Sequence, residues 1–202
     1  MRLHFSTTSP YARIVRVALA ENGCGNVEGH LTDPWKDAPS LLQANPSARV
    51  PSLVLDSGLS LNDSLLIVLW LETQQAGPSL LGSDPSRVIS NAGLAMGVID
   101  AAAAIIIGRK SSDAGFDETP VGLRRRRSVI QGFQRLEADP PPYRGGNLDL
   151  AVITAVVALD YVRFRFAGAP WLPAVPRLEV LAAATRDRPS LAATVPREMP
   201  SA

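Results

Sequence analysis

The sequence predicts an α/β unit followed by an all-α unit, and two observations carry this prediction. Up to about Gly77, short strand-like runs alternate with helical patterns in the order β-α-β-α-β-β-α, whereas from Arg87 onward helical patterns follow one another without a convincing strand pair. Between them, the stretch GPSLLGSDPS is rich in the Gly, Pro and Ser of connecting segments. We therefore expect one domain at residues 1–77, a linker at 78–86 and a helical domain at 87–202.

In the first unit, Pro10 suits a first helical position, and Asp56-Ser57-Gly58 between two apolar runs favours a tight hairpin turn. The remaining assignments rest on apolar runs and their spacing. The expected elements, in order, are a strand at RLHF (2–5), a helix from Pro10 to Asn22, a strand at VEGHL (27–31), a helix at PSLLQA (39–44), a hairpin at SLVLDSGLSL (52–61) and a helix at SLLIVLWLETQ (64–74).

In the second unit, helical spacing is clearest where Val129, Ile130, Phe133 and Leu136 share one face. The stretch DPPPYRGG breaks the chain before a strongly apolar segment. Helices are expected at residues 86–107 and 121–138, from about 148 to 164 and from about 176 to 186.

Composition excludes several classes of protein. The formal net charge is +1, from 20 basic and 19 acidic residues, so no bulk field attracts nucleic acid or an anionic membrane. One cysteine, Cys24, excludes an internal disulfide and fits a reducing compartment. His4 and His30 have no further ligands at metal spacing, so we expect no metal. The amino terminus has no apolar signal core, and LAVITAVVAL is too short to span a bilayer, so we expect a soluble cytoplasmic protein.

Three short motifs carry chemistry. In STTSPYAR, the simplest role of Ser9 is to cap the helix that begins at Pro10. In NPSARVPSLVL, Pro51 stands at the first position of a strand, where a cis bond after Val50 would turn the Val50 backbone toward a ligand.

The third motif, LNDSLLIVLWLE, places Asp63 and Ser64 at a helix amino terminus. They can be simple capping residues. Alternatively, the free N–H groups and the Ser64 hydroxyl bind a ligand carboxylate while Asp63 takes an ammonium group.

These motifs, in this order and spacing, resemble the thioredoxin-like domain of glutathione transferases. The related glutaredoxins have Cys-Pro-Tyr-Cys where this sequence has Ser9-Pro10-Tyr11-Ala12, so dithiol exchange is excluded. The resemblance implies that Ser9 activates the thiol of glutathione, with Thr7, Thr8 and Tyr11 as alternative groups. It also implies that Val50 and Pro51 clamp the cysteinyl part. Asp63 and Ser64 would hold the γ-glutamyl end, where the family more often has Glu before the Ser.

Further positions follow from the resemblance. Trp35, Lys36 and Arg49 match segments that reach the glycyl end of glutathione. Asp100 would reach the glutamyl ammonium in its own or a neighbouring subunit, because the family commonly forms dimers. An apolar wall for the electrophile would come from Tyr11, Met96, Ala103 and Ile107; the alternative for the stretch 101–107 is plain helix-packing core.

The resemblance covers nearly the whole chain. In GNLDLAVITAVVAL the family's capping box would place its cap on Gly146 and its acidic member on Asp149. The tail is similar to a bacterial subgroup in which a last helix precedes a Pro-Ser-Leu segment, here residues 189–191.

The resemblance therefore implies a bacterial glutathione transferase acting as a cytoplasmic homodimer, which conjugates glutathione, as cosubstrate, to a small hydrophobic electrophile in detoxification or uses it in a related thiol-dependent reaction. The alternative is a non-catalytic glutathione-binding or stress-related interaction protein of the same fold. A third class, a polyanion-binding helical protein, would use Arg124 to Arg127, but the run has no interleaved aromatics. We expect no nucleic acid or membrane partner.

Overall fold

The structure is a computed structural model that describes residues 1–24, 26–112 and 114–200. Its contacts divide the chain into two compact units. The first comprises Met1–Leu81 together with the tail that starts at Asp187, and the second comprises Gly82–Arg186. The sequence-based boundaries assigned this tail to the helical part, whereas its contacts group it with the α/β unit.

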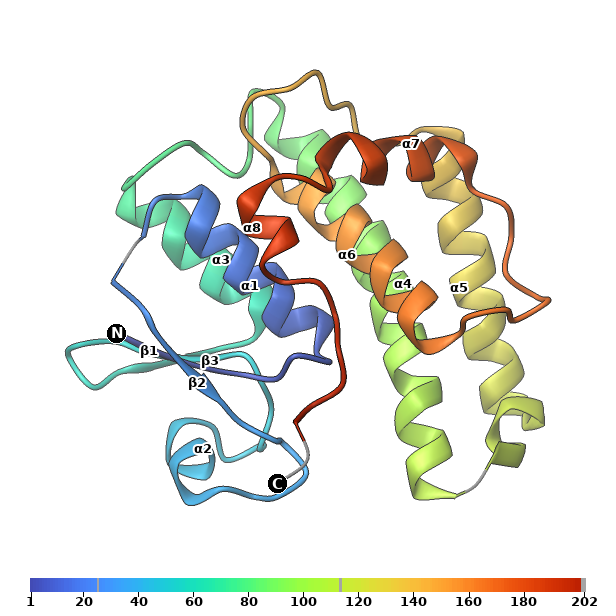
Figure 1. The fold of residues 1–202 in the computed structure, drawn as a ribbon, viewed down its shortest axis with the longest axis horizontal. Helices are drawn as coiled ribbons and strands as arrows, with labels where there is room; N and C mark the ends of the chain where they lie inside the picture. The colour runs from blue at the N-terminus through green and yellow to red at the C-terminus, as the bar shows by residue number, and fades with distance from the viewer. Residues whose placement is uncertain (25, 113, 201–202) are drawn as a thin grey trace. The chain divides into compact units, whose positions relative to one another are not determined.

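The first unit is built on one mixed four-stranded sheet with strand order β2-β1-β3-β4. β1 pairs parallel with β2 and antiparallel with β3, and β3 pairs antiparallel with β4. The predicted element order β-α-β-α-β-β-α is confirmed, and Figure 1 shows α1 and α3 on one face of the sheet and α2 on the other. The elements are β1 (Arg2–Phe5), α1 (Pro10–Glu21), β2 (Glu28–Leu31), α2 (Pro39–Ala44), β3 (Ser52–Val54), β4 (Ser60–Asn62) and α3 (Ser64–Gln74).

The core of the first unit lies between the sheet and the two helices that cover one of its faces. α1 buries a continuous apolar stripe that includes Ile14 and Ala18, and α3 buries Ile67 and Leu71. Leu53 of β3 is also fully buried. Removing this apolar surface from water is the main stabilisation of the unit, and it fixes the starts of α1 and α3 against the sheet.

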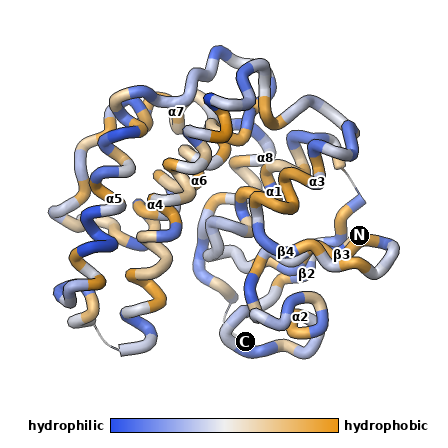
Figure 2. The backbone as a smooth tube through the Cα atoms, turned by 180° about the vertical axis from the view of Figure 1, so that it is seen from behind, coloured by the Kyte–Doolittle hydropathy of each residue, from blue (hydrophilic) through white to orange (hydrophobic). Residues whose placement is uncertain are grey.

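The second unit is helical throughout its regular structure. It contains α4 (Pro85–Ser111), the short 3₁₀ helix η1 (Ala114–Glu118), α5 (Pro120–Ala138), α6 (Leu150–Arg165) and α7 (Pro176–Thr185). α6 is buried along nearly its whole length, which matches its apolar sequence. Figure 2 shows this contrast, with α6 mostly apolar and α5 carrying long polar stretches.

α4 is long and apolar enough to cross a bilayer by length and composition alone. Half of its apolar window is buried inside the protein, as in the core helix of a soluble protein. α5 packs on α4 through the predicted face, in which Val129, Phe133 and Leu136 are buried.

The predicted cap of α6 at Gly146 is wrong. The N-cap is Asp149, whose carboxylate accepts a hydrogen bond of 2.9 Å from the Val152 amide. Gly146 lies three residues earlier with a φ of 84°, in the left-handed region that favours glycine. An Asp supplies the side-chain oxygen that the amide needs, so the helix begins one residue after it.

Candidate functional site

The register of the sheet brings the three predicted motifs to one end of it. β1 and β4 both run antiparallel to β3, so the start of β3 lies beside the ends of both neighbours: Ser52 is paired with His4 and with Asn62. The segment after β1 leads to Ser9, and the segment after β4 leads to Asp63. Motifs that are far apart in the sequence therefore share one edge of the first unit.

Ser9 caps α1, as predicted. Its Oγ accepts a hydrogen bond of 3.2 Å from the Ala12 amide. The same Oγ lies 3.5 Å from the carbonyl oxygen of Val50, the limit of hydrogen-bond distance. Because the cap uses an oxygen lone pair, the hydroxyl proton is left to this long contact among the described residues, and it can turn to a better acceptor.

The neighbouring hydroxyls have partners of their own. Thr7 Oγ1 donates to the sulfur of Met199 at 3.4 Å, and Thr8 Oγ1 lies 2.9 Å from Ser6 Oγ. Tyr11 is half-buried in the first turn of α1. The internal partners of Thr7 and Thr8 favour Ser9 as the group available to a ligand.

The Val50–Pro51 peptide bond is cis. The preceding carbonyl, that of Arg49, accepts hydrogen bonds from Asn45 Nδ2 at 3.1 Å and Ser52 Oγ at 2.9 Å. Val50 itself packs with Ala12 of α1 in a buried cluster. These contacts hold the Val50 backbone beside the start of α1.

Asp63 and Ser64 lie at the amino terminus of α3. Asp63 caps the helix by accepting a 3.0 Å hydrogen bond from the Leu65 amide, and its φ of 73° is left-handed. The Ser64 side chain is buried, and its Oγ has no hydrogen-bond partner among the described residues. A buried hydroxyl without a partner costs free energy, which an accepting ligand group would relieve.

The weaker candidates are more scattered. Trp35 and Lys36 follow β2, at the same end of the sheet because β2 is parallel to β1, and both are exposed, as is the Arg49 side chain. The remaining candidates lie on α4 in the second unit: Asp100 is exposed, Met96 and Ala103 are buried, and Ile107 is half-exposed.

The two histidines meet across β1 and β2. They are directly paired in register, and their rings lie edge to face with centroids 4.9 Å apart. His4 is buried beside Thr32, and burial, the charge of His30 and that of Arg2 hold the pKa of His4 below its ordinary value. Within residues 1–24, 26–112 and 114–200, no group of three His, Cys, Asp or Glu side chains could hold a metal ion.

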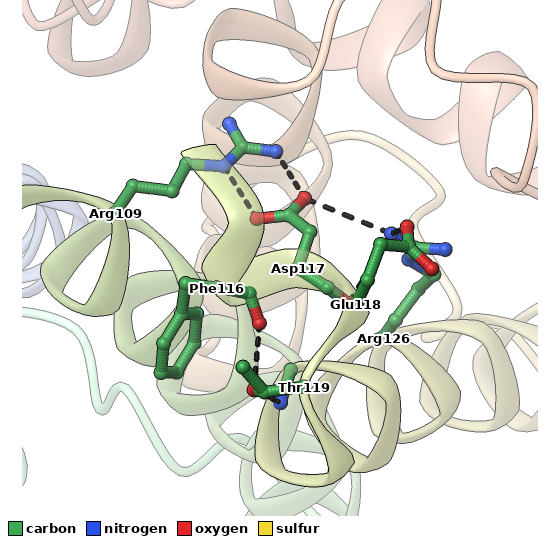
Figure 3. A network of polar contacts seen from close by, with 7 residues as sticks. Arg109, Phe116, Asp117, Glu118, Thr119 and Arg126 are labelled. Atoms are coloured by element: carbon green, nitrogen blue, oxygen red, sulfur yellow. Dashed lines mark hydrogen bonds and ion pairs between the residues drawn. The ribbon is translucent and has the colours of Figure 1, made fainter. Parts of the chain in front are cut away.

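One arginine of the run from Arg124 to Arg127 on α5 is engaged in ion pairs within the second unit. Arg126 pairs with Glu118 at 2.8 Å and with Asp117 at 3.8 Å, and its guanidinium lies over the Trp171 ring. Asp117 also forms a two-pronged pair with Arg109, as Figure 3 shows, which lowers the pKa of Asp117 and raises that of Arg109. This network ties η1 to α4 and α5, which is a structural role. Arg124, Arg125 and Arg127 are exposed.

Comparison with known proteins decides the family. Residues 3–79 match the family model of the glutathione S-transferase N-terminal domain. A glutathione S-transferase from Methylobacterium radiotolerans, solved in complex with glutathione sulfonate, is 31% identical; the match covers 100% of this chain and 97% of that chain with a TM-score of 0.88. The chain belongs to the glutathione S-transferase superfamily.

Other members are similar over nearly their full length. A glutathione S-transferase from Methylobacillus flagellatus KT, solved with glutathione bound, is 30% identical over 97% of this chain and 99% of that chain, with a TM-score of 0.85. The uncharacterized GST-like protein YibF of Escherichia coli K12 is 29% identical over 97% of this chain and 98% of its own. The resemblance that the motifs indicated is thus confirmed for the family and for its fold.

One segment reaches this end of the sheet without any signal in its sequence. Arg197 and Met199, in the tail, contact Thr7 two residues before Ser9. The stretch VPREMP has no motif that indicates such a contact, so only the folded chain reveals it.

Proposed function

We propose that this glutathione S-transferase superfamily member binds glutathione at the end of the sheet where Ser9, Val50 and Ser64 converge, and that it conjugates the thiol to small hydrophobic electrophiles. The observation that carries the proposal is the 3.5 Å approach of Ser9 Oγ to the Val50 carbonyl, because it joins two independently predicted motifs in one place. Relatives solved with glutathione or its sulfonate support the choice of ligand.

Ser9 is proposed as the catalytic residue. Its hydroxyl already accepts the Ala12 amide, so its proton can be donated to the sulfur of the bound tripeptide. The amino terminus of α1 adds the positive end of a helix dipole. Both effects favour thiolate over thiol, which lowers the thiol pKa and supplies the nucleophile near neutral pH.

The residues present suit the rest of the tripeptide. The Ser64 hydroxyl, which has no partner in the described part of the chain, and the start of α3 suit the γ-glutamyl carboxylate. The exposed Asp63 carboxylate suits its ammonium group. We assign the cysteinyl part to the backbone of Val50 and Pro51, and the glycyl carboxylate to Arg49, with Trp35 and Lys36 nearby.

Two variants test the proposal, after calorimetry has measured glutathione binding to the wild type. Ser64→Ala is expected to weaken binding by about 1–2 kcal/mol, the scale for a hydrogen bond to a charged group. Ser9→Ala is expected to raise the pKa of the bound thiol and slow conjugation by roughly ten- to a hundredfold, with little change in affinity. For Ser9→Ala, thiolate absorbance against pH measures the thiol pKa. Turnover with a panel of aryl halides, epoxides, isothiocyanates and peroxides measures the rate.

The outcomes separate the candidate functions. Unchanged affinity in Ser64→Ala would place the ligand elsewhere, and coincident thiolate titrations in Ser9→Ala would move activation to Thr7, Thr8 or Tyr11. Binding without turnover against the whole panel would leave a glutathione-binding protein that acts through partners.

The single cysteine and the family support a cytoplasmic location.

A further inference from the structure

The last part of the chain lies along α1 within the first unit. This segment, residues 187–200, is called the C-terminal strap, and it begins with α8 (Pro189–Ala192). Figure 1 shows the strap running past α1 toward the carboxyl terminus. Its position relative to α1 is fixed by polar contacts at three levels of the helix.

The first two levels anchor the strap to the body of α1. At the end of the helix, the Arg188 guanidinium donates hydrogen bonds to both carboxylate oxygens of Glu21 at 2.5–3.0 Å. Ser190 donates to the same carboxylate. In the middle, the buried Arg13 donates to Thr194 Oγ1 at 3.3 Å and to the Leu191 carbonyl at 3.4 Å. A two-pronged pair with a half-buried carboxylate has a fixed geometry, so these levels hold the strap in register with α1.

The third level lies at the start of α1. The Arg197 amide donates to the Thr7 carbonyl at 3.3 Å, and Thr7 Oγ1 donates to Met199 Sδ at 3.4 Å. The carbonyl and the hydroxyl of Thr7 are thus both engaged by the strap, and the residue is buried. The contact joins positions that are 192 residues apart in the sequence.

Thr7 belongs to the turn that presents Ser9. The Ser9 amide donates to the Ser6 carbonyl at 3.3 Å and closes the turn, in which Thr7 is the second residue. The amide and hydroxyl of Thr8 bond the Ser6 side chain from inside the turn. The strap contacts the same turn at Thr7, so the end of the strap restrains a residue two positions before Ser9.

We propose that the C-terminal strap positions the Ser6–Ser9 turn for thiol activation, with Thr7 as the positioning residue and with Arg197 and Met199 as its contacts. The inference rests on the proposed role of Ser9. Alignment of a hydrogen bond decides its strength, so a turn released from the strap donates less well to the sulfur. The thiol pKa then rises, whereas glutathione affinity is retained because Val50 and Ser64 stand on other elements.

Single substitutions can each remove one contact of the third level and leave the first two levels in place. Met199→Leu removes the sulfur acceptor and keeps the side-chain volume, and Arg197→Pro removes the amide donor. Arg197→Ala is the matched control, because it loses the same charge as the proline variant and keeps the amide. Val195→Thr is a second control, since Val195 is an exposed strap residue. A chain ending at Pro196 removes both contacts at once.

The readouts are the thiolate titration of bound glutathione, conjugation against pH, glutathione affinity and melting temperature. Arg197→Pro, Met199→Leu and the truncated chain are expected to raise the pKa of the bound thiol. At pH values below that pKa, conjugation should be about three- to tenfold slower than in wild type, and the rate should recover at high pH. Affinity should stay within about twofold of wild type, and both controls should titrate like wild type.

A lower melting temperature with an unmoved thiolate titration in folded Met199→Leu and Arg197→Pro would overturn the proposal and make the strap a purely structural element. An equal shift in Arg197→Ala would overturn it too, because charge and not the amide would then be the cause. Failure of the proposed function itself looks different: wild type would not bind glutathione, or Ser9→Ala would titrate like wild type.

Discussion

Ser9 has an observed role as a cap and a proposed role as a catalyst, and the two would use different parts of one oxygen. A lone pair accepts the Ala12 amide and caps α1, and the hydroxyl oxygen lies 3.5 Å from the Val50 carbonyl oxygen, the limit of hydrogen-bond distance. A residue that only capped would need the first contact alone. The two roles are therefore compatible, and the cap orients the hydroxyl that the ligand would use.

His4 gives a prediction at the same scale. The fold holds its pKa below the unfolded value of about 6.5, first through burial and then through the charges of His30 and Arg2. The unfolded chain therefore binds the proton more readily. The stability that His4 contributes is present above about pH 6.5 and is lost as the pH falls through the folded pKa.

Replacing His4 with Gln is expected to flatten this dependence, because Gln stays neutral and can still bond Thr32. Urea unfolding of both proteins between about pH 7.5 and pH 5 measures the free energy of unfolding, and a single group changes it by at most about 1.4 kcal/mol per pH unit. An unchanged slope in His4→Gln would assign the acid sensitivity to other groups. His30→Gln is the matched comparison on the exposed side of the pair.

At the scale of elements, the start of α6 gives a prediction about which residue caps the helix. Asp149→Ala is expected to lower the free energy of unfolding by about 1 kcal/mol, because the Val152 amide loses its acceptor. Asp149→Ser keeps an acceptor and serves as the control. Gly146→Ser is expected to lower stability by about 1 kcal/mol, since its φ of 84° is costly for a residue with a Cβ.

Urea denaturation of the three variants checks this prediction. A gain in stability in Gly146→Ser would restore Gly146 as the capping position. A wild-type midpoint in Asp149→Ala would mean that the first turn of α6 is satisfied without a side-chain cap.

α3 exposes two large apolar side chains, which bears on whether the chain forms a dimer. Leu66 and Leu69, one helical turn apart, are 60% and 57% exposed, while Ile67, Val68 and Leu71 are buried in the first unit. A helix that is apolar on all sides is normally covered on all sides. We propose that a second copy of the chain covers this face, in line with the family's tendency to form dimers.

At the scale of the whole molecule, the paired substitution Leu66→Glu and Leu69→Glu is expected to convert a dimer to a monomer, because it would bury two charges in the interface. Sedimentation equilibrium measures the mass, and circular dichroism checks the fold. Val180→Glu, at an exposed position of α7, is the control and should leave the mass unchanged. A monomeric wild type, or a charged variant that remains a dimer, would contradict the proposal.

The amino-acid sequence by itself determined the features that depend on neighbours within a few residues. Ser9 and Asp63 cap helices because their side chains reach amides two or three positions away. The helical face of α5 and the hairpin turn before β4 follow from local period and turn composition. These interactions need no knowledge of the rest of the chain. The α/β and helical units were predicted from the order of strand-like and helical runs, which is local information of the same kind.

Tertiary structure alone decided what depends on pairing between distant segments. The meeting of Ser9 with Val50 requires the register of β1 against β3, and the burial of His4 beside His30 requires that of β1 against β2. The hydrogen bond from Thr7 to the sulfur of Met199 depends on where the strap packs on α1. Such contacts are fixed by the cooperative burial of a whole core, so no local pattern in either partner specifies them.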